Sequence, residues 1–329
     1  MKKLLSVLLT LAALSAALCV PAAAEEAKET AEAPQKAPAF VRVWGKVSPW
    51  EGNGIYLKND SGDGSLDQVV VHVGERTPAV DAVTGLPLDL EKVKEGDTLY
   101  VWTRPMMALS MPPQVSALVI VGNVPADAAA PEYYELTSAG WKDPAGSDEI
   151  VFSCRDAEGT SQDLPVPLDA EVTPWLTRQI IRLDDIRPGS RILAWKDAGG
   201  AVSKVLVFPY AYQGFAAWNT AGTGIVNGEM VSVPGKVLKD EETGEKRICL
   251  PVRAMAEAAG YSVSWDKNRG AVVYDGNTEV VFYVWPGDDV LQTPEGETTL
   301  FAPCILEQGV TYLPAEDLCR ALNLYFYQD

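Results

Sequence analysis

The residues best suited to chemistry by type and spacing occur near the C-terminus, in the stretch LPVRAMAEAAGYSVSWD, residues 250–266. Arg253 and Glu257 are a base and an acid four positions apart, so they share one face of a helix. Two interpretations are open: a polar recognition site, or an ion pair on the helix surface or between helix and strand. We favour the ion pair, which contributes roughly a few tenths of a kcal/mol when exposed.

The same phrase returns 63 residues later as LPAEDLCRALNLYFYQD, residues 313–329. In both copies a proline, Pro251 or Pro314, stands where a helix can begin, because the first helical position needs no donor N–H. The first helix should end at Gly260 and the second at Asn323, since these two residue types best adopt the left-handed cap conformation. Each copy is therefore predicted to be a strand–helix–strand unit.

The apolar positions of the two predicted helices fall at helical spacing and make one stripe on each. They are Val252, Met255, Ala256 and Ala259 in the first copy, and Ala315, Leu318, Cys319 and Leu322 in the second. Because neither unit can bury its stripe alone, we expect the two copies to pack together.

The second copy does not keep the chemically active residues in place, because Glu316, Arg320 and Gln328 replace Arg253, Glu257 and Trp265. What is kept is what folds the unit, so the motif is interpreted as structural. We expect Trp265 to cover the helix stripe and Asp266 to cap the turn at residues 267–269. The motif residues are Pro251, Arg253, Glu257, Gly260, Trp265, Asp266, Pro314 and Asn323. No catalytic, cofactor-binding or metal-binding residue is assigned.

Three segments, IVNGE, ICLPVRAMAEAAGYSVSWDKNRGAVVYDG and QGVTYLPAEDLCRALNL, together resemble the copper amine oxidase N-terminal-like domain. The resemblance covers residues 225–329, about a third of the chain. Such modules occur repeatedly in secreted proteins of Gram-positive bacteria, so the resemblance implies a source of that kind. In the oxidases the module is an accessory domain without the metal, so the resemblance implies no oxidase activity.

Metal chemistry finds little support in the composition. A copper oxidase site needs several imidazoles, and His72 is the single histidine of the chain. The acidic loop at residues 59–67, NDSGDGSLD, could cradle calcium, but Val70 stands where the usual loop has glutamate. An acidic hairpin tip is the favoured interpretation, and calcium binding stays open.

Four cysteines follow the first 24 residues: Cys154, Cys249, Cys304 and Cys319. Their scattered spacing favours small buried thiols over a disulfide framework. A bridge, if one forms, should join two of Cys249, Cys304 and Cys319.

The N-terminal residues 1–24 combine two lysines, an uncharged apolar run and a small-residue cleavage site, as in a secretory signal peptide. Residues 25–38 are predicted to be a disordered linker. The 27 basic residues less Lys2 and Lys3 leave 25, against 45 acidic ones, a net charge of −20. This charge argues against nucleic acid as a partner. No later stretch has the roughly 20 apolar residues of a membrane span.

The rest of the chain is predicted to be mainly β, with an α+β C-terminal domain. Residues 39–124 and 131–210 show short strands between turn residues, which is typical of small barrel- or sandwich-like domains. The segment 90–102 is similar to 183–195 at an offset of 93, so the two β domains are expected to be related. The Gly- and Ala-rich residues 211–224 are predicted to be a linker to the domain at 225–329.

We therefore expect a secreted, non-catalytic binding or scaffolding protein, either extracellular or associated with the cell wall. Its partner would be wall glycan or another envelope protein. The alternative is an envelope glycan hydrolase that uses paired carboxylates in the β domains, since the chain offers 45 of them. The sequence does not fix the ligand or the oligomeric state.

Overall fold

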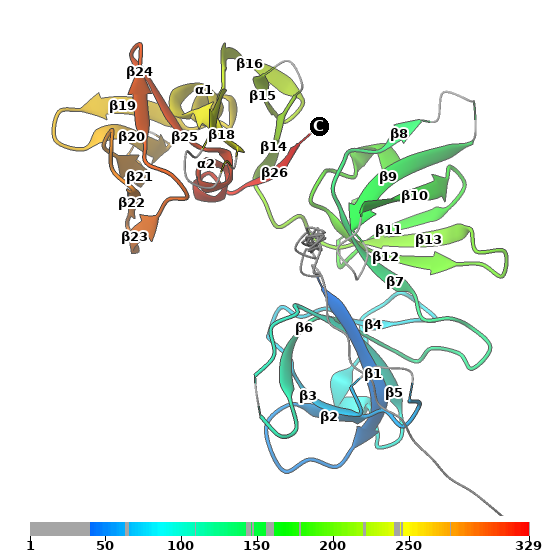
Figure 1. The fold of residues 1–329 in the computed structure, drawn as a ribbon. Helices are drawn as coiled ribbons and strands as arrows, with labels where there is room; N and C mark the ends of the chain where they lie inside the picture. The colour runs from blue at the N-terminus through cyan, green and yellow to red at the C-terminus, as the bar shows by residue number, and fades with distance from the viewer. Residues whose placement is uncertain are drawn as a thin grey trace, which may run out of the picture. The chain divides into compact units, whose positions relative to one another are not determined.

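The structure, a computed structural model, describes residues 40–328 except 63–65, 109, 143–145, 147, 156–160, 178, 220–221, 240–243, 245 and 277. The predicted signal peptide and the linker at residues 25–38 lie outside the described residues. As predicted, the described chain is mainly β, with two short α-helices near its end (Figure 1). In this part of the chain, neither helix has the length and apolar content needed to cross a membrane.

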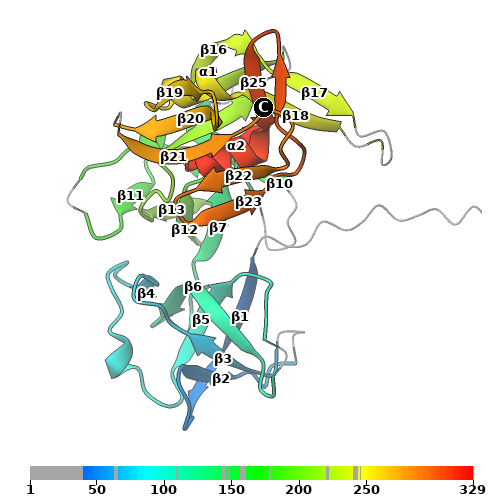
Figure 2. The ribbon, with the colours of Figure 1, turned by 90° about the vertical axis from the view of Figure 1, so that its left-hand side faces the viewer.

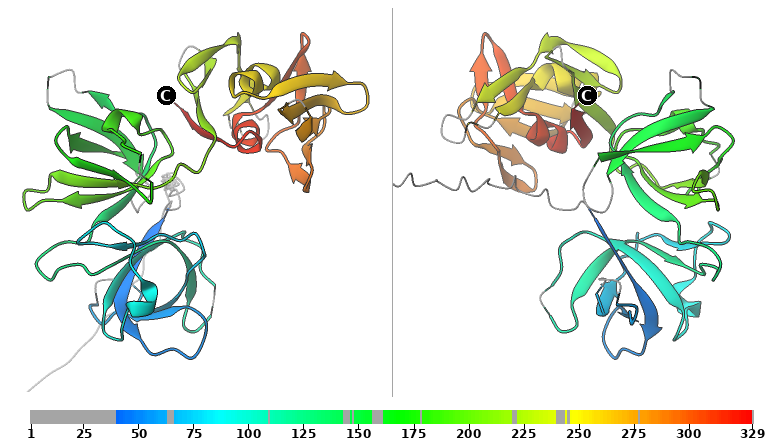
Figure 3. Two further views of the ribbon diagram at one scale, coloured as in Figure 1. Left: turned by 180° about the vertical axis from the view of Figure 1, so that it is seen from behind. Right: turned by 45° about the vertical axis from the view of Figure 1, so that its right-hand side comes forward.

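The first six strands form one sheet in the order β3-β2-β1-β5-β6-β4. A parallel pairing between β3 and β6 closes this sheet into a barrel, and the ring of blue and cyan strands is visible in Figure 3. Side chains from all around the ring, such as Leu57, Leu99 and Ile120, fill the barrel interior. The strands are β1 (Val41–Ser48), β2 (Ile55–Lys58), β3 (Gln68–His72), β4 (Ala79–Asp81), β5 (Thr98–Thr103) and β6 (Gln114–Gly122).

The next seven strands form a second sheet in the order β10-β9-β7-β12-β13-β11, with β8 paired to β9. If β8 is left aside, the six other strands follow the same order in their sheet as β1 to β6 do in the first sheet. The outer pair is parallel in both sheets, β11 with β13 and β4 with β6. The strands are β7 (Glu132–Leu136), β8 (Trp141–Lys142), β9 (Glu149–Arg155), β10 (Ser161–Pro167), β11 (Glu171–Pro174), β12 (Arg191–Lys196) and β13 (Val202–Val207).

The expected relation between the two β regions is visible at the predicted repeat. A 3-10 turn, η1 (Leu90–Lys92), precedes β5, and another, η2 (Leu183–Asp185), precedes β12. The second turn begins at Leu183, 93 positions after the first begins at Leu90. The strand after it begins at Arg191, again 93 positions after Thr98, where β5 begins. Because the two β sheets share their strand order and these turns, they have the same topology.

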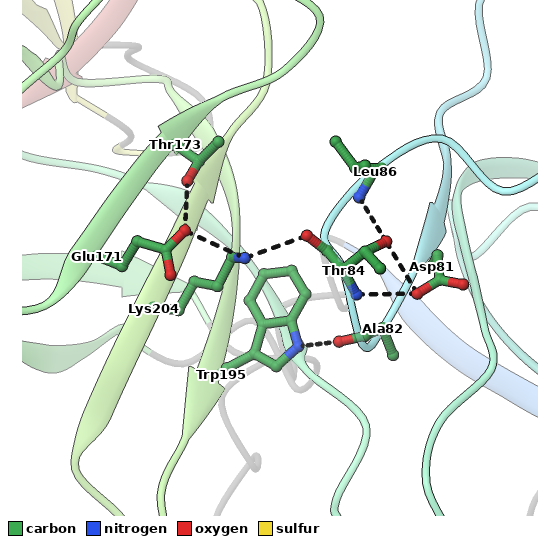
Figure 4. Close-up of polar contacts among 8 residues, drawn as sticks. All are labelled: Asp81, Ala82, Thr84, Leu86, Glu171, Thr173, Trp195 and Lys204. Atoms are coloured by element: carbon green, nitrogen blue, oxygen red, sulfur yellow. Dashed lines mark hydrogen bonds and ion pairs between the residues drawn. The ribbon is translucent and has the colours of Figure 1, made fainter.

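The two β sheets share a hydrophobic cluster that includes Trp102 and Val121 of the first and Leu193 and Leu206 of the second. Trp195 of β12 donates its indole N–H to the carbonyl oxygen of Ala82 over 2.7 Å (Figure 4). The Nζ atom of Lys204 lies 3.3 Å from the carbonyl oxygen of Thr84 and 3.3 Å from a carboxylate oxygen of Glu171. Apolar packing and directed hydrogen bonds therefore join the two sheets.

The remaining strands make three sheets around the two helices. The orders are β16-β15-β14-β26, β17-β18-β25-β24 and β19-β20-β21-β22-β23, the last of which is seen in Figure 2. The elements are β14 (Gly214–Trp218), β15 (Thr223–Val226), β16 (Glu229–Pro234), β17 (Lys236–Lys239), β18 (Lys246–Pro251), α1 (Val252–Ala258), β19 (Ser262–Asp266), β20 (Gly270–Asp275), β21 (Glu279–Val284), β22 (Val290–Thr293), β23 (Gly296–Thr299), β24 (Ile305–Glu307), β25 (Val310–Pro314), α2 (Ala315–Ala321) and β26 (Leu324–Gln328).

The prediction that residues 211–224 form a linker is wrong for much of this segment. It contains β14, which pairs in parallel with β26 so that Phe215 lies opposite Tyr325. Ala216 and Ala217 of β14 are fully buried. The small residues that resembled a flexible connector instead allow close packing between the sheet and its neighbours.

The doubled phrase folds as predicted into β18-α1-β19 and β25-α2-β26. The apolar stripes are buried except for the half-buried Ala259, and Met255 and Leu318 are both at 0 % exposure. Gly260 and Asn323 end the helices with φ of 93° and 51°. Both prolines stand one position earlier than predicted, because Pro251 and Pro314 keep an extended ψ and are the last residues of their strands.

Candidate functional site

A groove of about 430 Å³ opens beside α1 and β19, which belong to the first copy of the motif. We call it the α1 groove. Four motif residues line it: Pro251, Arg253, Glu257 and Trp265. Strand β16 and the β24–β25 hairpin supply the facing wall, with Val233 and Val310 among its apolar residues. The groove therefore combines an apolar lining with one base, one acid and one indole.

Arg253 is held in place from two sides. Its Nη1 atom donates to Glu257 Oε1 over 3.0 Å and to the carbonyl oxygen of Val263 over 2.6 Å. The ion pair expected from the sequence is thus present within α1, and the bond to Val263 joins α1 to β19. About half of each charged side chain remains exposed, so the pair also presents polar edges on the groove wall.

Trp265 does not cover the helix stripe, contrary to expectation. Its side chain is 49 % exposed and lies against Trp285, which is 40 % exposed. The ring centroids are 5.8 Å apart and the planes are tilted by 39°. The cause is its position near the end of β19, the outer strand of its sheet, where a side chain has neighbours on fewer sides. The result is a pair of half-exposed indoles, of which Trp265 lines the α1 groove.

Asp266 has the capping role predicted for it. Its Oδ1 atom accepts N–H bonds from Asn268 over 2.8 Å and Arg269 over 3.1 Å. The bond from Asn268 is the largest influence that holds the pKa of Asp266 below its usual value. The carboxylate is thereby committed to shaping the turn after β19.

The second copy contains a buried acid that the sequence reasoning missed. Asp317 of α2 is 2 % exposed, and its Oδ2 atom accepts the backbone N–H of Phe301 over 2.7 Å. It also forms an ion pair with Arg320. Burial is the main cause that raises the pKa of Asp317, against the lowering effect of these partners. The sequence signal that could have revealed this buried acid is its position directly before Leu318, which belongs to the predicted buried stripe.

Asn323 and Arg320 border a hollow of about 730 Å³ beside α2, which Asp275, Glu279 and Glu295 also line. This hollow is distinct in lining from the α1 groove, since no residue borders both. Pro314, the remaining motif residue, borders a third hollow at the start of α2. The eight motif residues are therefore not gathered in one place.

The residues do not fit a copper site. His72 forms a hydrogen bond with Gln114 through Nε2 at 2.7 Å, and the described residues contain no cluster of three or more histidines, cysteines or carboxylates placed for a metal ion. The centre of the acidic loop, residues 63–65, lies outside the described residues. At its start, Asn59 Oδ1 accepts the N–H of Ser61 over 2.9 Å, as in a turn.

Cys154, Cys249, Cys304 and Cys319 are reduced and buried. This agrees with the interpretation as small buried thiols. Burial raises the pKa of Cys249 to about 11 and those of Cys304 and Cys319 to about 12. Such thiols are poor nucleophiles, so they add no reactive group to the α1 groove.

Comparison with known proteins supports the resemblance seen in the sequence. None of the curated proteins compared with the chain matches it. A family model does match, and it covers the segment that starts within β15 and runs to the end of the chain. Residues 225–329 are thus similar to the copper amine oxidase N-terminal domain, the family expected from the doubled phrase.

Proposed function

We propose that this chain is a non-catalytic binding or scaffolding protein of the cell envelope, and that the α1 groove holds a segment of wall glycan. The observation that carries the proposal is the half-exposed indole of Trp265 beside the Arg253–Glu257 pair on one groove wall. The leader-like residues 1–24 and the net charge of −20 after their removal support a location outside the cytoplasm.

Sugar rings have apolar C–H faces and polar hydroxyl edges, and the groove offers a partner for each. Indole rings supply large, rigid apolar surface at little entropic cost. The guanidinium and carboxylate groups can donate to and accept from hydroxyls in charge-assisted hydrogen bonds, which are stronger than neutral ones. Because Arg253 is already fixed by Glu257 and Val263, binding would cost little further ordering of that side chain.

The alternative, a glycan hydrolase with paired carboxylates in the β sheets, needs one carboxylic acid with a raised pKa. Glu132 of the second sheet shows the opposite. Burial acts to raise its pKa, but hydrogen bonds from Lys196 and Tyr134 lower it overall. Glu132 is therefore unsuited to act as the general acid, and no observation favours this alternative over binding.

The test is retention of the mature protein on purified insoluble peptidoglycan, with release of soluble sugar measured in the same tube. We expect Trp265→Ala to weaken retention at least tenfold, which corresponds to about 1.4 kcal/mol. Trp141→Ala is the matched control, because Trp141 is 43 % exposed and belongs to another sheet. Equal retention of both variants, or release of sugar by the wild type, would overturn the proposal.

A further inference from the structure

The outer surface of the first β sheet carries aromatic and basic side chains along β1, β2 and the turn between them. Because side chains alternate along a strand, Trp44 and Lys46 of β1 and Tyr56 and Lys58 of β2 point away from the buried interior. Together with Trp50 of the turn, we call these residues the lysine face. The strands β1, β2 and β5 contain no aspartate or glutamate, although the chain has 45 acidic residues.

Trp50 and Tyr56 form a fixed pair of rings at one end of the lysine face. Trp50 is 40 % exposed, and its ring centroid lies 5.2 Å from that of Tyr56, with the planes tilted by 36°. The Tyr56 hydroxyl donates to Gln68 Oε1 over 2.7 Å. The indole lies so close to Gly52 that a Cβ there would be 2.5 Å from Trp50 Nε1. Both rings are therefore held in position before a ligand arrives, which lowers the entropic cost of binding.

Lys46 and Lys58 stand directly opposite each other in the antiparallel pair β1–β2. Both are exposed, and within the described part of the chain neither forms an ion pair with an acidic residue. Like charges that face each other across two strands repel one another. An anion between the two ammonium groups would remove this repulsion. The ammonium of Lys58 also lies 5.5 Å from the centre of the Tyr56 ring, so this charge is next to the aromatic pair.

Trp44 and Tyr100 form a second pair of rings beyond Lys46. They are half-buried and stacked, with centroids 5.7 Å apart and planes tilted by 16°. Tyr56 lies opposite Ser48 and Tyr100 lies opposite Trp44, so the two ring pairs are roughly 14 Å apart along β1. The lysines lie between the ring pairs. A ligand that contacts both pairs must therefore be a chain of several rings.

The chemistry of the lysine face fits an oligosaccharide that carries carboxylate groups. Sugar rings present apolar C–H faces to the aromatic rings, and a carboxylate offers one oxygen to each ammonium group in a charge-assisted hydrogen bond. Single-stranded nucleic acid also stacks on aromatic rings, but it is bound in a basic groove that follows its backbone. The negative net charge of the chain acts weakly here, because exposed charges more than about 8–10 Å apart are largely screened at physiological salt.

We propose that the lysine face binds an acidic oligosaccharide, with sugar rings on Trp50 and Tyr56 and a carboxylate between Lys46 and Lys58. This site lies on a different sheet from the α1 groove. It does not depend on glycan binding in that groove, so either proposal can fail alone.

The test is isothermal titration calorimetry of the mature protein with two matched probes, cellohexaose and the same hexamer oxidised to a carboxylate at every C6 carbon. We expect the carboxylated hexamer to bind at least tenfold more tightly than cellohexaose. Trp50→Ala should weaken binding of the carboxylated hexamer at least tenfold. Trp141→Ala is the matched control, because Trp141 is 43 % exposed and belongs to the second sheet, and it should bind as the wild type does.

Lys46→Gln and Lys58→Gln are the second set of variants, because both residues are exposed and their replacement should leave folding intact. Each should weaken binding of the carboxylated hexamer, and the double variant should bind the two hexamers equally. The proposal is overturned if the wild type binds neither hexamer or both equally, or if Trp50→Ala binds as tightly as Trp141→Ala. Tighter binding of a single-stranded oligothymidylate than of the carboxylated hexamer would also overturn it.

Discussion

Leu250 of β18 lies directly opposite Leu313 of β25 in an antiparallel pair, with Cys249 opposite Pro314 and Pro251 opposite Tyr312. Leu250 and Leu313 are also the same position of the two motif copies. A local twofold relation therefore passes through this pair. Both leucines are fully buried in the cluster that also holds the two helix stripes, so each copy covers what the other cannot bury.

Leu313→Ala should lower the free energy of unfolding by about 2–5 kcal/mol, as for other large-to-small changes in cores. Urea denaturation monitored by fluorescence measures this loss. Leu306→Ala, at a side chain 46 % exposed, should cost less than about 0.5 kcal/mol. The double variant with Leu250→Ala should depart from additivity, because the two residues are in contact across the pair. A cost for Leu313→Ala close to that of Leu306→Ala would contradict the central role of the pair.

Trp195→Phe removes the indole N–H that binds the carbonyl of Ala82 while keeping an aromatic ring between the two β sheets. We expect a loss of about 1 kcal/mol in the free energy of unfolding, the usual contribution of one hydrogen bond. Trp141→Phe is the control, since that residue belongs to β8 and is partly exposed. Equal stability of the two variants would show that the bond does not help to join the sheets.

The sequence predicts the helices of the C-terminal part and their ends well. The residue types of Gly260 and Asn323 alone indicate that a helix ends there in the left-handed backbone conformation. The spacing of apolar residues around Met255 and Leu318 identifies the buried stripes. These signals are local, so no knowledge of distant contacts is needed. The same holds for the turns that begin at Leu90, because apolar anchor, glycine turn and strand follow one another directly in the chain.

What the sequence could not supply depends on residues that are far apart. β14 was missed because its partner β26 lies about a hundred residues later, and parallel pairing leaves no hairpin signal between them. Trp265 was expected to be buried because the sequence of β19 does not show that this strand lies at the edge of its sheet. That position depends on which strands pair with one another. Asp317 was overlooked because the N–H that it accepts belongs to Phe301, in a segment before β24.

Asp81 should contribute to stability in a pH-dependent way. Burial raises its pKa, but hydrogen bonds from Asn123, Thr84 and Val83 outweigh that effect and leave the pKa below the ordinary value of 3.8. A carboxyl with a lowered folded-state pKa stabilises fully above its unfolded pKa, and the contribution disappears as pH falls through the folded-state value. Asp81→Asn should therefore be less stable than wild type at pH 7, and the gap should close below pH ~4. A gap that is constant with pH would contradict this account.

The four described cysteines should resist modification in the folded protein. Thiolates are the reactive form, and burial raises the pKa of Cys249, Cys304 and Cys319 far above neutral pH. Titration with Ellman's reagent at pH 8 should show almost no fast reaction in the native mature protein, and four reactive thiols in guanidinium chloride. Fast labelling of one thiol without denaturant would show that the core around it opens. Fewer than four thiols in denaturant would indicate a disulfide in the purified protein.

Substitutions at the two helix ends test whether Gly260 and Asn323 act in the two motif copies through their backbone geometry. Gly260 has φ of 93°, and a Cβ placed there would meet no atom within 4 Å, so Gly260→Ala isolates the cost of the left-handed backbone. We expect a loss of about 1–2 kcal/mol. Asn323→Gly, at φ of 51°, should change stability by less than about 0.5 kcal/mol, because relief of strain offsets the added freedom of the unfolded chain. Equal costs in thermal or urea unfolding would mean that these residues act through side-chain contacts, and the interpretation of the motif as architecture would fail at its helix ends.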